Sequence, residues 1–219
     1  MIRVTELHKA YGNLQVLRGL SLDIPTAELV AIVGPSGAGK STLLQLMGTL
    51  DKPDRGEVFF NGQSVFAMSD SALADFRNRQ IGFVFQQHHL LPEFTAEENV
   101  LLPAMISGKI TPEKKAYAHE LFELLGVSAR KDHKPAALSG GEQQRFAVAR
   151  ALINKPAVLL ADEPSGNLDT HNARELHQLF LTLRETYKQT IVVVTHNMAL
   201  AQLADRKITL VDGVVQQNA

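Results

Sequence analysis

The run GPSGAGKST at residues 34–42 constrains the fold of this chain more than any other feature. It fits the phosphate-binding loop, in which glycines let backbone amides curl around phosphate groups. An apolar segment at 29–33 precedes it and a helical pattern over 40–50 follows it, which is the strand–loop–helix context that the motif requires. We predict that Lys40 reaches the β- and γ-phosphates and Ser41 contacts Mg²⁺. The nucleotide-binding residues predicted here are Gly34, Pro35, Ser36, Gly37, Ala38, Gly39, Lys40, Ser41 and Thr42.

A second segment is an apolar run that ends in two acids. Residues 158–161 read VLLA, and Asp162 and Glu163 follow them. A carboxylate at the C-terminal end of a strand points into the crevice where open α/β sheets bind ligands. We expect Asp162 to hold Mg²⁺ and Glu163 to orient or deprotonate an attacking water. A solvated acidic turn is the alternative, and the phosphate loop in the same chain disfavours it.

A third segment, LSGGEQQR at residues 138–145, precedes a helix rich in small and apolar residues. Ser139 and the amides of Gly140 and Gly141 would form a second anion site at a helix terminus, although Ser139 also fits an ordinary N-cap. The chain thus has two candidate phosphate-binding segments, the loop at 34–42 and residues 139–141, which we call the two cradles. Their number indicates that each nucleotide lies between one cradle of one chain and one cradle of a second chain. We therefore predict a second copy of the chain as a partner.

Strand and helix patterns alternate along most of the sequence. This alternation predicts an α/β fold with a mostly parallel sheet covered by helices on both faces, preceded by an antiparallel β subdomain. The expected strands cover residues 2–11, 14–24, 29–33, 56–60, 81–85, 158–161, 191–195 and 208–211, and the expected helices cover 40–50, 112–125, 172–187 and 199–204.

The middle of the chain is helical. Thr95 can cap a helix there, with Glu98 three residues later completing a capping box. We interpret residues 92–153 as a helical lobe inserted into a single domain. Residues 1–91 and 154–219 would then form the nucleotide-binding core.

Composition excludes several classes of protein. The net charge is −1 without long runs of like charge, so no nucleic-acid partner is expected. The chain has no cysteine, which excludes a disulfide framework and a cysteine-based zinc site. No segment approaches the roughly 18–20 apolar residues of a membrane span. We expect a soluble chain that contacts a membrane only through partners.

The order of these motifs resembles the nucleotide-binding subunits of ABC transporters, over essentially the whole chain. The resemblance implies ATP as the nucleotide, Mg²⁺ as its metal and ATP hydrolysis coupled to translocation. It also implies roles for four further residues. Gln86 would contact the metal and water, Asp169 would lie in a segment that crosses the dimer interface, His196 would contact the γ-phosphate, and Tyr11 would stack on adenine.

The segments FQQHHLLPEFTAEENVLLPA and LADEPSGNLD resemble one branch of that family. The branch includes the lipoprotein-releasing ATPase (LolD-like), to which the first segment looks closest, and the ATPases of macrolide export and cell division, which remain alternatives. The closest resemblance implies two transmembrane permease subunits (LolC/LolE-like) and a peripheral place on the cytoplasmic face of the bacterial inner membrane. We expect residues 87–103, with Leu90, Leu91 and Phe94, to dock a short helix of each membrane subunit.

Four of the other seven histidines need an interpretation of their own. His88 and His89 are adjacent, but no further ligands stand at the spacing of a metal site, so we expect none there. His171 and His177 are predicted to face solvent on their helix.

Overall fold

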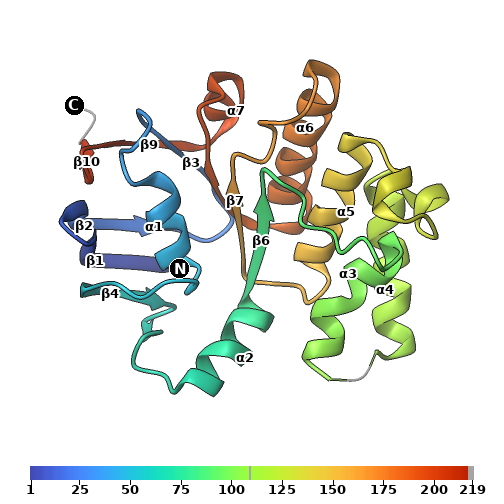
Figure 1. Ribbon diagram of the computed structural model, residues 1–219, viewed down its shortest axis with the longest axis horizontal. Coiled ribbons are helices and arrows are strands. Elements are labelled where there is room, and N and C mark those ends of the chain that lie inside the picture. Colours follow the sequence, from blue (N-terminus) through green and yellow to red (C-terminus); the bar gives the residue numbers. More distant parts are fainter. Residues whose placement is uncertain (109, 217–219) are drawn as a thin grey trace.

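A six-stranded sheet runs through the structure (Figure 1), a computed structural model that describes residues 1–108 and 110–216. Its strand order is β10-β9-β3-β8-β7-β6. Five strands are parallel and β10 pairs antiparallel with β9. The strands are β3 (Leu29–Val33), β6 (Ile81–Phe85), β7 (Val158–Asp162), β8 (Thr190–Val194), β9 (Arg206–Val211) and β10 (Val214–Gln216).

A smaller antiparallel sheet has the order β2-β1-β4-β5. It confirms the expected antiparallel subdomain. Two of its strands, β4 and β5, follow the first helix along the chain. The backbone amide of Arg18 donates to the carbonyl oxygen of Gly213 at 3.1 Å and ties the two sheets together. The strands of the smaller sheet are β1 (Ile2–Tyr11), β2 (Leu14–Ile24), β4 (Arg55–Phe60) and β5 (Gln63–Ser64).

Helices cover both faces of the larger sheet (Figure 1). Helices α3, α4 and α5 are inserted between β6 and β7, which are neighbours in the sheet. Among the described residues, no helix combines the length and apolarity needed to cross a membrane. The helices are α1 (Lys40–Met47), α2 (Asp70–Gln80), α3 (Ala96–Ile106), α4 (Pro112–Leu124), α5 (Gly140–Leu152), α6 (Thr170–Tyr187) and α7 (Met198–Leu203).

The central strands are buried on both faces, which explains their unbroken apolar sequences. In β8, Val192 and Val194 pack in the cluster that contains the apolar side chains of α1. Ile191 and Val193 pack in the other cluster, which contains those of α5 and α6. Because alternate residues of a strand point to opposite faces, α1 and α5 lie on opposite sides of this sheet.

Two element predictions need correction. Helix α1 ends at Met47 instead of residue 50, because Thr49 takes a left-handed backbone with φ of 59°. Helix α2 has no counterpart among the predicted helices. Leu73 is its one buried residue, so its sequence shows no periodic apolar stripe. The capping box predicted at Thr95 is confirmed, with Glu98 as its second member.

Candidate active site

The predicted phosphate-binding loop connects β3 to α1. Gly34 has a φ of 152°, and a Cβ there would lie 2.0 Å from the carbonyl oxygen of Leu210, so no larger residue fits. The Nζ atom of Lys40 donates hydrogen bonds of 2.9 Å to the carbonyl oxygens of Gly34 and Pro35, which holds the ammonium group against the loop. The loop amides and the positive end of the α1 dipole suit this turn to phosphate groups. The other predicted members of the loop and the first turn of α1 are Ser36, Gly37, Ala38, Gly39, Ser41 and Thr42.

Asp162 ends β7 beside the first turn of α1. Its Oδ1 atom accepts a hydrogen bond of 3.1 Å from the hydroxyl of Ser41. Burial raises the pKa of the Asp162 carboxyl, and the negative charge of Glu163 raises it further. A hydroxyl and a desolvated carboxylate at this distance fit a divalent cation, because the positive charge would offset the cost of burying the carboxylate.

Glu163 and His196 follow neighbouring strands and meet at their ends. Glu163 has a φ of 46°, which is unusual for a residue other than glycine, and its backbone amide donates to the carbonyl oxygen of Val194 at 2.9 Å. Its Oε2 atom lies 3.1 Å from the backbone nitrogen and 2.9 Å from Nδ1 of His196. The carboxylate therefore has a fixed orientation at the edge of the sheet where ligands bind.

Gln86 leaves β6 beside the two acids, because Phe85 is in register with Asp162. The structure places its side chain against Asn167. The Gln86 side-chain amide donates to Oδ1 of Asn167 at 2.9 Å, and the Asn167 amide donates to the Gln86 backbone oxygen at 3.2 Å. This reciprocal pair joins β6 to the segment that follows β7.

Asp169 is the N-cap of α6. Its Oδ1 accepts a hydrogen bond of 2.9 Å from the backbone amide of Asn172, and its Oδ2 accepts one of 2.6 Å from the Asn172 side chain. Hydrogen bonds from Asn172 hold the pKa of the Asp169 carboxyl below its usual range. Asp169 thus fixes the far end of the segment at residues 165–169.

Tyr11 exposes 48% of its surface at the end of β1. Its hydroxyl donates to Oδ2 of Asp51 at 2.8 Å, and the Nζ atom of Lys9 lies 5.1 Å from the ring centroid. Burial of the hydroxyl and its bond to Asp51 raise the pKa of Tyr11. The polar end of the ring is anchored while much of the side chain stays accessible, as stacking on a base requires.

The second predicted cradle, Ser139, Gly140 and Gly141, starts α5. Ser139 caps the helix: its hydroxyl accepts from the backbone amide of Glu142 at 3.3 Å, and its own amide donates to the Glu142 carboxylate at 2.7 Å. That backbone amide lowers the pKa of Glu142. Among the described residues, no hydrogen bond joins this cradle to the phosphate-binding loop. The helices that the two cradles begin, α1 and α5, pack on opposite faces of the larger sheet.

Two buried polar residues were missed by sequence reasoning. His177 was predicted to face solvent, and this was wrong: it is 4% exposed, and its Nε2 atom lies 3.1 Å from the hydroxyl oxygen of Ser165. Gln144 is also buried and donates to the carbonyl oxygen of Pro164 at 2.7 Å. Both hold the chain directly after Glu163.

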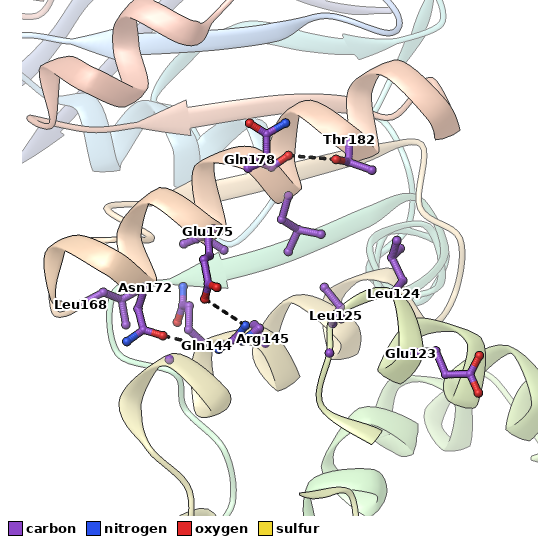
Figure 2. A pocket seen from close by; sticks show the side chains of 14 residues that line it. Glu123, Leu124, Leu125, Gln144, Arg145, Leu168, Asn172, Glu175, Gln178 and Thr182 are labelled. Atoms are coloured by element: carbon purple, nitrogen blue, oxygen red, sulfur yellow. Dashed lines mark hydrogen bonds and ion pairs between the residues drawn. The ribbon is translucent and has the colours of Figure 1, made fainter. Parts of the chain in front are cut away.

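A cavity of about 360 Å³ opens along the seam between α5 and α6, next to the end of α4 (Figure 2). Arg145 of α5 spans the polar end of the seam, with Nη1 3.2 Å from a carboxylate oxygen of Glu175 and Nη2 3.4 Å from Oδ1 of Asn172. A Cβ on Gly141 would lie 2.1 Å from the same Asn172 oxygen, so the helices touch closely there. Leu124 and Leu125 line the apolar part of the cavity.

Comparisons with known proteins identify the family of the chain. The family model described as ABC transporter matches residues 17–166. The lipoprotein-releasing system ATP-binding protein LolD of Bacteroides fragilis is 58% identical, over 97% of this chain and 99% of its own. The same-named protein of Bacteroides thetaiotaomicron is 56% identical over the full length of both chains.

Two solved structures share the fold. A dimeric structure of MJ0796, described as a bacterial ABC transporter cassette, has a TM-score of 0.91 and 41% identity, over 99% of this chain and 97% of its own. A dimeric post-hydrolysis state of the ATP-binding cassette MJ0796 bound to ADP and Pi has a TM-score of 0.90 and 40% identity, with the same coverage.

Proposed function

The chain belongs to the ABC transporter family, and on this premise we propose that it is the ATP-hydrolysing subunit of a complex that releases lipoproteins from the bacterial inner membrane toward the outer membrane. The cargo rests on relatives of similar length, which are named lipoprotein-releasing system ATP-binding proteins. One observation gives the main support for assigning ATP hydrolysis. Glu163 is fixed by His196 at the sheet edge that also carries the phosphate-binding loop.

The chemical step follows from these positions. Glu163 takes a proton from a water molecule whose oxygen forms a bond to the γ-phosphorus, while the bond from that phosphorus to the β–γ bridging oxygen breaks. Lys40 and the loop amides stabilise the phosphate charge. Tyr11 stacks on the adenine. His196 orients Glu163 and, after rearrangement, reaches the γ-phosphate.

We propose Ser41, Asp162 and Gln86 as the residues that hold Mg²⁺, which when bound supplies positive charge to the β- and γ-phosphates. The bond between Ser41 and Asp162 and the raised pKa of Asp162 support this assignment. Gln86 must exchange its bond to Asn167 for this role. That exchange would link events at the nucleotide to the segment at residues 165–169.

The active unit that we propose is a dimer with two composite sites. The phosphate-binding loop of one copy and Ser139, Gly140 and Gly141 of the other enclose each ATP. Their separation within one chain supports this arrangement, as does the dimeric state of the solved MJ0796 structures. Asp169, at the end of its segment, would face the second copy.

We also propose that residues 92–153 form a lobe that tilts against a core made of residues 1–91 and 154–219. The seam cavity supports this division, because a close-packed joint would resist such a movement. The polar bridge from Arg145 to Glu175 would act as one contact point of the joint (Figure 2).

A second cavity, of about 440 Å³, supports docking of two LolC/LolE-like membrane subunits at the cytoplasmic face of the inner membrane. It lies between α2, β6, α3 and α5, with apolar walls at Phe83 and Phe85 and guanidinium groups at Arg77 and Arg150. Arg150 also donates to the carbonyl oxygens of His88 and His89, which fixes the adjoining loop. An apolar wall with basic groups fits a short amphipathic helix that carries acidic residues.

The test of this function is reconstitution with the membrane subunits. We propose residues 87–103, which Arg150 attaches to the edge of this second cavity, as the docking surface. Leu91 in this segment is 43% exposed and Leu203 on α7 is 42% exposed, so they make a matched pair. We expect Leu91→Glu to lower complex yield and lipoprotein release, while Leu203→Glu keeps both. If Leu91→Glu changed neither, the docking surface would be wrong. A parent complex that hydrolyses ATP and releases no lipoprotein would overturn the cargo and favour a macrolide-export or cell-division role.

A further inference from the structure

His177 is a buried polar residue on an otherwise apolar helix face. Its neighbours Leu176 and Phe180 belong to the main apolar cluster on that side of the sheet. Burying an imidazole is unfavourable unless its nitrogens are hydrogen-bonded. Within the described part of the chain, the hydroxyl of Ser165 is the side-chain partner of His177, with its oxygen 3.1 Å from Nε2. Burial also lowers the pKa of His177, which favours the neutral form of the ring.

Ser165 begins the segment that ends at Asp169, and both ends of this segment are attached to α6. Asp169 caps the first turn of α6, and Ser165 contacts His177 on the same helix. His177 is eight residues after Asp169, which is about 12 Å along the helix axis. The middle of the segment is held by the reciprocal pair of Asn167 and Gln86. The segment thus has two attachments to a rigid helix and one to β6.

The segment is packed on one side, where Leu168 lies against the apolar cluster of α5 and α6, and borders a cavity on another. A cavity of about 360 Å³ lies next to it, lined by Ser165 and His177 together with Glu163, His196 and Arg174. A segment that borders a void lacks dispersion contacts on that side, so its position depends strongly on its few polar contacts. Glu163 is two residues before Ser165 and lines the same cavity.

We propose that His177 is a positioning residue for hydrolysis, which acts through Ser165 to fix residues 165–169 and, through them, the orientation of Glu163. The inference rests on the proposed ATPase function. It assigns His177 no contact with nucleotide: the phosphate-binding loop lies on other elements and keeps its own hydrogen bonds. Loss of the contact should therefore lower kcat and leave KM for ATP nearly unchanged.

Four variants of the full chain separate this role from simple packing. His177→Phe keeps a buried ring and removes the hydrogen bond, and His177→Gln returns a side-chain amide that can reach the same hydroxyl. Ser165→Ala removes the other partner with minimal change of volume. His171→Gln is the matched control, because His171 lies on the same helix with 81% of its side chain exposed.

Two readouts are measured on each variant: steady-state ATP hydrolysis, and amide hydrogen exchange of a peptide covering residues 163–169. We expect His177→Phe and Ser165→Ala each to lower kcat about fivefold to tenfold, the loss that one hydrogen bond accounts for. We also expect KM to stay within about twofold and exchange in the peptide to become faster. A fifth chain that combines His177→Phe with Ser165→Ala should lose no more rate than either single variant, and His177→Gln should recover most of the rate.

The inference is overturned if His177→Phe hydrolyses ATP and exchanges like the parent, or if His177→Gln is as slow as His177→Phe. It is also overturned if the double variant shows the product of the two single effects. A parent chain without ATPase activity would instead overturn the proposed function. In that case the exchange of the 163–169 peptide still decides whether His177 holds the segment.

Discussion

Glu163 differs from an ordinary acid at the end of a strand. Its φ of 46° costs energy that a solvated turn would avoid, and its carboxylate is fixed by two contacts to His196. Sequence order predicted a carboxylate after β7 and a histidine after β8. The contact between them follows from the pairing of β7 with β8, which the sequence motifs do not specify.

The first prediction separates the chemical step from binding. Glu163→Gln should bind ATP like the parent and lose about 10²–10⁴ in turnover, because an amide does not accept the proton of water. Lys40→Ala should weaken ATP binding, because it removes the charge held over the loop. Fluorescent-nucleotide titration and phosphate release measure the two effects. Near-parental turnover in Glu163→Gln would remove Glu163 as the base.

A second prediction concerns pH and His177. Burial lowers its pKa in the folded chain, so the unfolded chain takes up the proton more readily. The stability that His177 contributes is present above its unfolded pKa of about 6.5 and is lost as pH falls through the lower folded value. Glu163, Arg174 and His196 line the same cavity as His177, and a His177→Gln variant keeps these three residues.

We therefore expect Tm of the parent to fall more steeply between about pH 7 and pH 5 than Tm of His177→Gln. Thermal unfolding at several pH values measures the slopes, and exposed His171→Gln should match the parent. Identical slopes in all three chains would show that His177 is not buried in a neutral form.

At the scale of elements, the sequence predicted most of the fold. Strands β1, β2 and β3 and helix α6 begin and end within two residues of their predicted positions, because turn residues and apolar periods mark them. Helix α2 was missed because Leu73 is its one buried residue, so no apolar stripe marks it. Strand β10 was missed because a strand of three residues is too short to show an alternating apolar pattern. His177 was misplaced because a polar side chain on an amphipathic helix usually faces water, whereas here the segment after β7 covers it.

Asn99 gives a prediction at the element scale. It is fully buried in α3, and its side chain bonds the backbone of Leu91 through both polar atoms, at 2.7 Å and 3.0 Å. It also donates to the carbonyl oxygens of Phe94 and Thr95. This one side chain therefore shapes the loop that we propose as the docking surface.

Asn99→Leu should destabilise the chain by about 1–3 kcal/mol, because it leaves buried backbone groups without partners. It should also reduce binding to the membrane subunits while ATP binding by the folded chain is retained. Urea unfolding and co-purification measure the two effects, with exposed Gln63→Leu as the control. Normal assembly by the destabilised variant would show that the loop shape does not determine docking.

At the scale of the whole molecule, the central feature is that the two predicted phosphate cradles begin helices on opposite faces of the larger sheet. The phosphate-binding loop starts α1 on one face of the sheet, and Ser139 starts α5 on the other. Sequence motifs predicted both cradles and a second copy from their number. The sheet geometry adds a reason, since α1 and α5 pack in separate apolar clusters on opposite faces of the sheet.

Sedimentation of the Glu163→Gln chain tests this account most directly, because slow hydrolysis preserves the ATP-bound state. With ATP and Mg²⁺ we predict a dimer, with ADP a monomer, and with ATP in a Glu163→Gln, Ser139→Glu double variant a monomer, because a carboxylate in the second cradle repels the phosphates. ATP-loaded monomers of Glu163→Gln at high protein concentration would contradict the composite site.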